Sequence, residues 1–102
     1  MEAHPTLDQL EVFVAVAETG GFSAAARRLN RSQSVVSYAI ANLEAQLEVR
    51  LFERAGTRLP SLTEAGAVLL EDARRILAGL EGMRARAGGL KSGLEPELVL
   101  AV

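Results

Sequence analysis

The side chains whose types and spacing could do chemistry gather between residues 31 and 42, and the chemistry they offer is hydrogen bonding. They are Arg31, Ser32, Gln33, Ser34, Ser37, Tyr38 and Asn42. A glutamine can make paired hydrogen bonds to adenine, a serine can reach a phosphate or a base edge, and a tyrosine can contact a thymine methyl group or a phosphate. These residues predict contact with double-stranded DNA, provided that one helix face carries them.

Arginines extend this set toward the phosphate backbone. Arg54 and Arg58 flank a predicted turn, where they could hold phosphates or enter a minor groove; a solvated charge or a local ion pair is the alternative. Residues 22–62 carry six basic and three acidic residues, whereas residues 1–21 carry acids only. The formal net charge of -2 for the whole chain counts against DNA binding, but this local basic excess favours it.

Other kinds of chemistry find no support in the sequence. With no cysteine and a single histidine, His4, we expect no thiolate and no multi-histidine metal site. No nucleophile is paired with a base, and Gly20-Gly21 lacks the preceding strand that a nucleotide-binding glycine loop requires. We therefore predict no catalytic residue, no enzyme activity, no metal and no cofactor. The short apolar runs predict a soluble, unprocessed protein that spans no membrane, and the absence of cysteine fits a cytoplasmic location.

Three helices must position the polar residues. Thr6 and Gln9 form a predicted capping box at the start of a first helix over residues 7–18, which Gly20-Gly21 ends. Its apolar face carries Leu10, Phe13, Val14 and Ala17. Ser23 is the predicted N-cap of a second helix over residues 24–29, and Asn30 can close that helix in a left-handed turn.

Ser32 is the predicted cap of a third helix, and this helix carries the candidate DNA-binding face. Its buried stripe is Val36, Ile40, Leu43 and Leu47, so residues 34, 37, 38, 41 and 42 point the other way. Two short helices joined by a tight turn are the layout that inserts a helix into a major groove. A three-helix bundle whose outer face is merely solvated fits the same spacing, as does a protein-interaction module that binds no DNA.

A hairpin and a long helix are expected next. Alternation around Gly56, with Pro60 limiting the pairing to an edge, predicts a small β-hairpin. A fourth helix opens at Thr63, and its apolar residues are spaced 4, 3, 4 and 3, as in a coiled coil between two copies: Leu69, Ala73, Ile76, Leu80 and Met83. Packing of this seam on its own domain is the alternative. Gly88-Gly89 is predicted to break the helix before a hinge and a buried strand from Leu98, the start of a further α/β domain.

The ordered set of residues resembles the LysR-type transcription regulators over residues 5 to about 90. The matching positions are Phe13 through Val16, Gly21-Phe22-Ser23-Ala24-Ala25-Ala26, Leu29, Ser32-Gln33-Ser34-Val35-Val36-Ser37, Ile40, Leu43-Glu44, Leu47, Leu51-Phe52-Glu53-Arg54 and Leu62-Thr63-Glu64-Ala65-Gly66. The resemblance implies a mainly α winged helix-turn-helix over residues 1–62, a linker helix over 63–89 that pairs two copies as an antiparallel coiled coil, and an effector-binding domain that begins within 90–102.

The resemblance also implies roles and partners. Residues matching Gln33, Ser34, Ser37 and Tyr38 lie at the major groove in this family, and those matching Arg54 and the wing arginine, Arg58, approach the backbone or the minor groove. The first expected partner is double-stranded DNA that carries an inverted repeat. The second is another copy of the chain, with tetramers in the full-length protein. The third is a small-molecule effector, bound only by the further domain.

Three positions depart from the family pattern. Glu48 stands where glycine usually follows the recognition helix, so either this position avoids a left-handed conformation or it costs about 1 kcal/mol. Tyr38 occupies a position that is often arginine, which removes a charge from the groove and should change base preference. The wing between Arg54 and Thr63 is one residue longer than usual.

Overall fold

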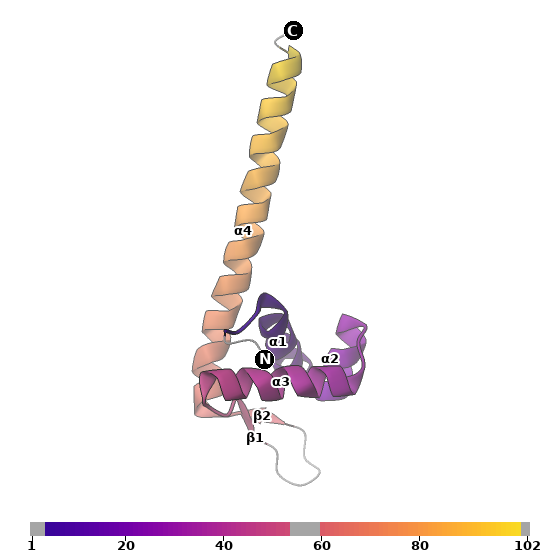
Figure 1. The fold of residues 1–102 in the computed structure, drawn as a ribbon, viewed down its shortest axis with the longest axis vertical. Helices are drawn as coiled ribbons and strands as arrows, with labels where there is room; N and C mark the ends of the chain where they lie inside the picture. Colours follow the sequence, from indigo (N-terminus) through magenta and orange to yellow (C-terminus); the bar gives the residue numbers. More distant parts are fainter. Residues whose placement is uncertain (1–3, 54–59, 101–102) are drawn as a thin grey trace.

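A computed structural model of the chain describes residues 4–53 and 60–100, with side chains through residue 92. Its elements, in chain order, are α1 (Leu7–Thr19), α2 (Phe22–Leu29), α3 (Gln33–Leu47), β1 (Phe52–Glu53), β2 (Ser61–Leu62) and α4 (Glu64–Leu100). Helices α1 to α3 and the hairpin form a compact head, and α4 extends from it as a single long rod (Figure 1). The molecule measures 67 × 26 × 25 Å. The predicted winged helix-turn-helix followed by a long helix is therefore confirmed.

Capping explains where α1 begins and ends. The Gln9 amide donates to the Thr6 hydroxyl at 3.1 Å, and the Thr6 amide donates to Gln9 Oε1 at 2.8 Å, so the predicted capping box forms. Gly20 ends the helix with a φ of 83°, a conformation that glycine adopts without the Cβ penalty. The sequence placed this helix correctly to within one residue.

Helix α2 begins earlier than the sequence indicated. Gly21 is its N-cap and makes no side-chain cap hydrogen bond, so the predicted cap at Ser23 is wrong. Ser23 lies inside the helix, and its hydroxyl donates to the Gln33 side chain instead. The other end agrees with the prediction, because Asn30 closes α2 in the left-handed region with a φ of 58°.

The core of the head lies where the helices meet the hairpin. The rings of Phe13 and Phe22 both pack edge-on against Phe52, with centroid separations of 5.7 and 6.1 Å. Fully buried aliphatic side chains surround this aromatic cluster: Val12, Val16, Val36, Ile40, Leu43 and Leu51. The three residues of α3 in this list belong to its predicted buried stripe, which fixes the rotation of α3 about its own axis.

The hairpin and the start of α4 form one joint. Phe52 pairs with Leu62, and Glu53 pairs with Ser61, in an antiparallel register. The Thr63 hydroxyl accepts from the Gly66 amide at 2.8 Å, which caps α4, and donates to the Arg50 carbonyl at 2.6 Å. Because a Cβ on Gly66 would lie 2.1 Å from the Leu51 carbonyl oxygen, only glycine lets α4 approach the hairpin this closely.

The C-terminal prediction requires a correction. We expected a break at Gly88-Gly89, a hinge and a strand from Leu98, but α4 runs through these segments to Leu100. A helical glycine costs roughly 1 kcal/mol relative to alanine, which weakens a helix without ending it. The apolar run after Leu98 finds no partner strand among the described residues, and a helix satisfies its backbone hydrogen bonds locally.

Candidate DNA interface

The outer face of α3 carries the predicted DNA-binding residues in accessible positions. Arg31, Ser32, Gln33 and Ser34 are exposed at its start, and Tyr38 is 68% exposed one turn further on. Ser37 and Asn42 are partly buried, and both belong to the same helix as the exposed residues. On the opposite stripe of α3, Val36, Ile40 and Leu43 are completely buried, and Leu47 is partly buried. The structure thus brings the helix residues of the predicted set together on one surface.

The tight turn that presents α3 is held by its own backbone. The Arg31 amide donates to the Ala26 carbonyl at 2.9 Å, and the Asn30 amide donates to the Arg27 carbonyl at 3.2 Å. Ser32 then caps α3 by accepting from the Val35 amide at 3.2 Å. The free amides of the first turn of α3 therefore lie beside a group of hydroxyl and carboxamide side chains, which suits contact with a phosphate.

Arg31 forms an ion pair at this turn. Its guanidinium makes a two-pronged pair with the Asp8 carboxylate of α1, with distances of 2.7 and 2.6 Å. The hydrogen bonds from Arg31 lower the pKa of Asp8, and they raise the pKa of Arg31 in turn. Arg31 therefore forms a local ion pair, the alternative named above for Arg54 and Arg58.

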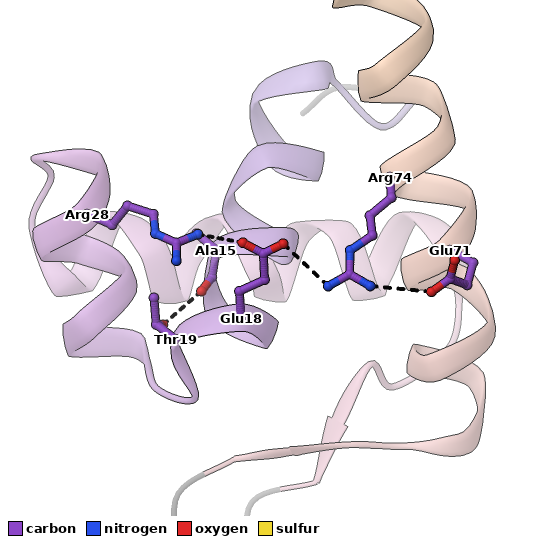
Figure 2. Close-up of polar contacts among 6 residues, drawn as sticks. All are labelled: Ala15, Glu18, Thr19, Arg28, Glu71 and Arg74. Atoms are coloured by element: carbon purple, nitrogen blue, oxygen red, sulfur yellow. Dashed lines mark hydrogen bonds and ion pairs between the residues drawn. The ribbon is translucent and has the colours of Figure 1, made fainter.

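A second ion-pair cluster joins the helix-turn-helix to α4, and Figure 2 shows it with Glu18 at its centre. The Glu18 carboxylate accepts from Arg28 of α2 at 2.7 Å and from Arg74 of α4 at 3.3 Å. Arg74 also pairs with Glu71 on its own helix. Hydrogen bonding from Arg28, with a smaller contribution from Arg74, lowers the pKa of Glu18. Three helices therefore meet at one carboxylate.

Glu44 ties the recognition helix to the wing. Its Oε2 atom accepts from the Leu51 amide at 2.8 Å and from the Phe52 amide at 3.4 Å. These hydrogen bonds hold the start of β1 against α3. The predicted wing residues Arg54 and Arg58 lie outside the described residues.

Three acids have structural roles that the sequence does not reveal: Asp8, Glu18 and Glu44. Their partners lie 23, 10 and 7 residues away, and no sequence pattern marks such pairs.

The structure resolves the question of Glu48. This residue ends α3 in the left-handed region with a φ of 58° and ψ of 37°, and its amide donates to the Glu44 carbonyl. Of the two alternatives, the strained one is therefore present, with an estimated cost of about 1 kcal/mol.

The predicted dimerisation seam divides into two parts. Ala73 is 2% exposed and belongs to the core of its own head, with Leu69 packed beside it. Ile76 and Met83 are 50% and 57% exposed, and Leu80 is partly buried. An apolar groove of about 350 Å³ lies near the boundary between these two parts of the seam, and α1, α3 and α4 line it. Its walls include Leu7, Leu10, Leu47, Leu69 and Ile76.

Residues 4–53 and 60–100 contain no helix long and apolar enough to cross a membrane. The same residues contain no cluster of three or more histidine, cysteine or acidic side chains that could hold a metal ion.

Known proteins with similar sequences include bacterial transcriptional regulators. The family model for the bacterial regulatory helix-turn-helix proteins of the lysR family matches residues 7–67. A transcriptional regulator of Azotobacter vinelandii is 50% identical over 95 residues, which cover 93% of this chain and 65% of that protein. The regulator AceR of Acinetobacter baumannii is 46% identical over 95 residues, which cover 93% of this chain but 32% of AceR. The chain thus spans less than two thirds of the length of either relative.

Solved structures agree with this assignment. The DNA-binding domain of CbnR, solved in complex with DNA, is 49% identical, with a TM-score of 0.72 over 82% of this chain and 98% of that domain. The DNA-binding domain of BenM, solved with benA site 1 DNA, is 34% identical, with a TM-score of 0.81 over 86% of this chain and 98% of that domain. From the matched family model, these relatives and the shared winged helix-turn-helix, we conclude that the chain belongs to the LysR family of bacterial regulatory proteins.

Proposed function

We propose that residues 1–102 form a sequence-specific DNA-binding module that acts as a dimer on an inverted-repeat operator. The observation that carries this proposal is the division of α3 into a stripe with Val36, Ile40 and Leu43 fully buried and an exposed polar face with Gln33, Ser34 and Tyr38. A helix with this division can enter a major groove without disturbing its own core. The similar CbnR and BenM domains were solved in complex with DNA, which supports DNA as the partner.

Each part of the head has a role in the proposal. Gln33, Ser34, Ser37 and Tyr38 read base edges, with Ser32 and Asn42 at the margins of this face, while arginines of the turn and the wing hold the sugar-phosphate backbone. Arg54 and Arg58 are the wing candidates. Affinity falls as salt rises, and Arg54→Ala should make this dependence shallower. The slope of log affinity against log salt should decrease in magnitude by about one unit.

The dimer is proposed to form along α4. Ile76, Leu80 and Met83 provide the accessible part of the seam, and Leu69 and Ala73 support it from within the head. Two-fold symmetry in the protein then matches two-fold symmetry in the operator, and the α4 pair sets the spacing between the two recognition helices.

The proposal places the protein in the bacterial cytoplasm and assigns it no enzymatic reaction and no cofactor. A small-molecule effector is assigned to a domain outside these 102 residues, and tetramers to the longer protein.

Selection from randomised duplex DNA at near-physiological salt tests the proposal. Purified residues 1–102 should enrich an inverted repeat, which requires both base reading and a two-fold dimer. If a folded dimer enriches no sequence, the module binds other proteins rather than an operator, and the proposal is wrong.

A further inference from the structure

We propose that Ser23 of α2 is a positioning residue that sets the base preference of Gln33, an inference that rests on the proposed role of Gln33 in reading DNA. The Ser23 hydroxyl donates to Gln33 Oε1 at 2.8 Å across the helix-turn-helix. Ser23 is the second residue of α2, and Gln33 is the first residue of α3. Both side chains are exposed, so the hydrogen bond lies on the surface that DNA would cover.

The orientation of the glutamine carboxamide decides which base it can read. A carboxamide has an acceptor oxygen on one side and a donor NH₂ group on the other, and a half-turn of its last bond exchanges the two. In the major groove adenine presents the N6 donor beside the N7 acceptor, whereas guanine presents two acceptors, O6 and N7. A carboxamide held in one orientation therefore matches adenine, and its oxygen would face the guanine O6 atom.

Ser23 supplies such a restraint before DNA binds. In the structure the Ser23 hydroxyl donates to the carboxamide oxygen, so this oxygen faces α2 and the Gln33 NH₂ group is directed elsewhere. The carboxamide oxygen has a second lone pair, so it can accept from adenine N6 while it keeps the bond to Ser23. Glutamine is among the side chains that lose most rotamer freedom on ordering, so a partner that orders it in advance reduces the entropy lost on binding.

The test compares Ser23→Ala with Ser23→Thr, using residues 1–102 and operator variants that carry adenine or guanine at each position. Gln33→Ala first identifies the base pair that Gln33 reads. At that position Ser23→Ala should lower the preference for adenine over guanine by about three- to tenfold, the effect of losing one neutral hydrogen bond. Ser23→Thr keeps the hydroxyl and should preserve the preference.

Folding should not obscure this result, because the Ser23 side chain is exposed and alanine is a stronger helix former than serine. Circular dichroism spectra of both variants should match that of the parent. The salt dependence of binding should also stay unchanged, since the proposed role involves no phosphate.

A double-mutant cycle separates positioning from the other roles that Ser23 could have. In the Gln33→Ala background, Ser23→Ala should cause no further change in base preference. Ser23→Ala could instead lower the affinity for every operator variant equally, also in the Gln33→Ala background. That result would mean that Ser23 contacts the DNA backbone directly. It would overturn the Ser23 inference and leave the proposed function standing. If Gln33→Ala alters no base preference while the parent still enriches an operator, both the Ser23 inference and the reading role of Gln33 are wrong.

Discussion

Tyr38 is an exposed member of the predicted reading residues, and its chemistry differs from that of the arginine common at this position in the family. The residue is 68% exposed on α3, one turn beyond Ser34. A tyrosine contributes hydrogen bonding and apolar contact without a full charge, so it should influence base choice rather than counterion release. Tyr38→Ala should therefore change the selected operator sequence while the salt slope stays within error of the parent.

The matched control is Tyr38→Arg, which introduces the charge. It should steepen the salt slope by up to about one unit and shift base preference toward guanine. Identical selected sequences for the parent and Tyr38→Ala would remove Tyr38 from the reading surface.

Asp8 gives the head a measurable acid sensitivity. The hydrogen bonds from Arg31 lower the pKa of Asp8 below its usual 3.8, so the folded state binds this proton less readily than the unfolded state. The stabilisation from the pair is therefore complete well above pH 3.8 and is lost as the pH falls through the lowered value. Because about half of the Asp8 side chain is exposed, the contribution is a few tenths of a kcal/mol.

Melting temperatures at pH 7 and pH 3 for the parent and Asp8→Asn measure this contribution. The parent should be the more stable of the two at pH 7, and the difference should shrink at pH 3. Asp72→Asn is the control, because Asp72 also pairs with an arginine, Arg75, but within α4. A difference between parent and Asp8→Asn that is the same at both pH values would contradict the assigned cause.

At the scale of elements, the contact between α4 and the hairpin depends on the absence of a side chain at Gly66. Gly66→Ala would place a Cβ 2.1 Å from the backbone oxygen of Leu51, the residue before β1, so α4 must shift away from it. Overpacking of this kind costs about 1–3 kcal/mol. Chemical denaturation should show that loss. Gly79→Ala is the matched control: it meets nothing within 4 Å, and it should stabilise the exposed helix by about 0.5–1 kcal/mol.

Glu48 ends α3 in a conformation that favours glycine, and its replacement should stabilise the head. Glu48→Gly relieves the left-handed strain, which outweighs the added freedom of the unfolded chain, and the net gain should be about 0.5 kcal/mol or more. Asn30→Gly provides the comparison, because Asn30 has the same φ of 58° but asparagine tolerates it. Thermal melts should separate the two, and equal responses would argue against strain at Glu48.

Element boundaries were predictable from the sequence wherever a local interaction sets them. The Thr6 capping box, the Ser32 cap and the left-handed Asn30 depend on residues close in the chain, and all three occur as expected. The α3 face was equally accessible, because periodicity determines which residues a helix buries. The start of α2 was missed because Gly21 provides an extended N-cap without a side-chain hydrogen bond, so no residue type marks it.

The interactions that join elements were not predictable. Ser23 meets Gln33, Asp8 meets Arg31 and Glu18 meets Arg74 only after the helices have packed. The last of these pairs spans 56 residues. The length of α4 was also misjudged, since paired glycines weaken a helix and an apolar run without alternation suits a buried helix as well as a strand.

For the whole molecule, the base of α4 determines where the head lies relative to any partner. Helix α4 has 37 residues and is therefore about 55 Å long, so a small rotation at its base becomes a large displacement further along. Contacts that hold that base include the burial of Ala73 in the core, the Thr63 bond to Arg50, the close approach of Gly66 and the Glu18 ion pair with Arg74. Figure 1 shows that the rest of α4 extends clear of the head, which leaves its far part free to pair.

The division of the α4 seam predicts two different responses to substitution. Ala73 lies in the core of the head, so a larger side chain there should reduce stability, whereas Met83 is more than half exposed and should matter only in the dimer. Met83→Glu would place a charge in the proposed interface and should weaken dimerisation at least tenfold, measured by sedimentation equilibrium. Val68→Glu is the control, because Val68 is 62% exposed on the same helix but lies outside the seam.

The same two variants connect assembly to DNA binding. A monomer retains the complete α3 face and should still bind a half-site, but it loses the second set of contacts that an inverted repeat offers a dimer. Met83→Glu should therefore lower the ratio of full-site to half-site affinity, while Val68→Glu keeps it. A Met83→Glu protein that remains dimeric and keeps this ratio would show that the two copies meet elsewhere, and the apolar groove beside Ile76 would then be the next surface to substitute.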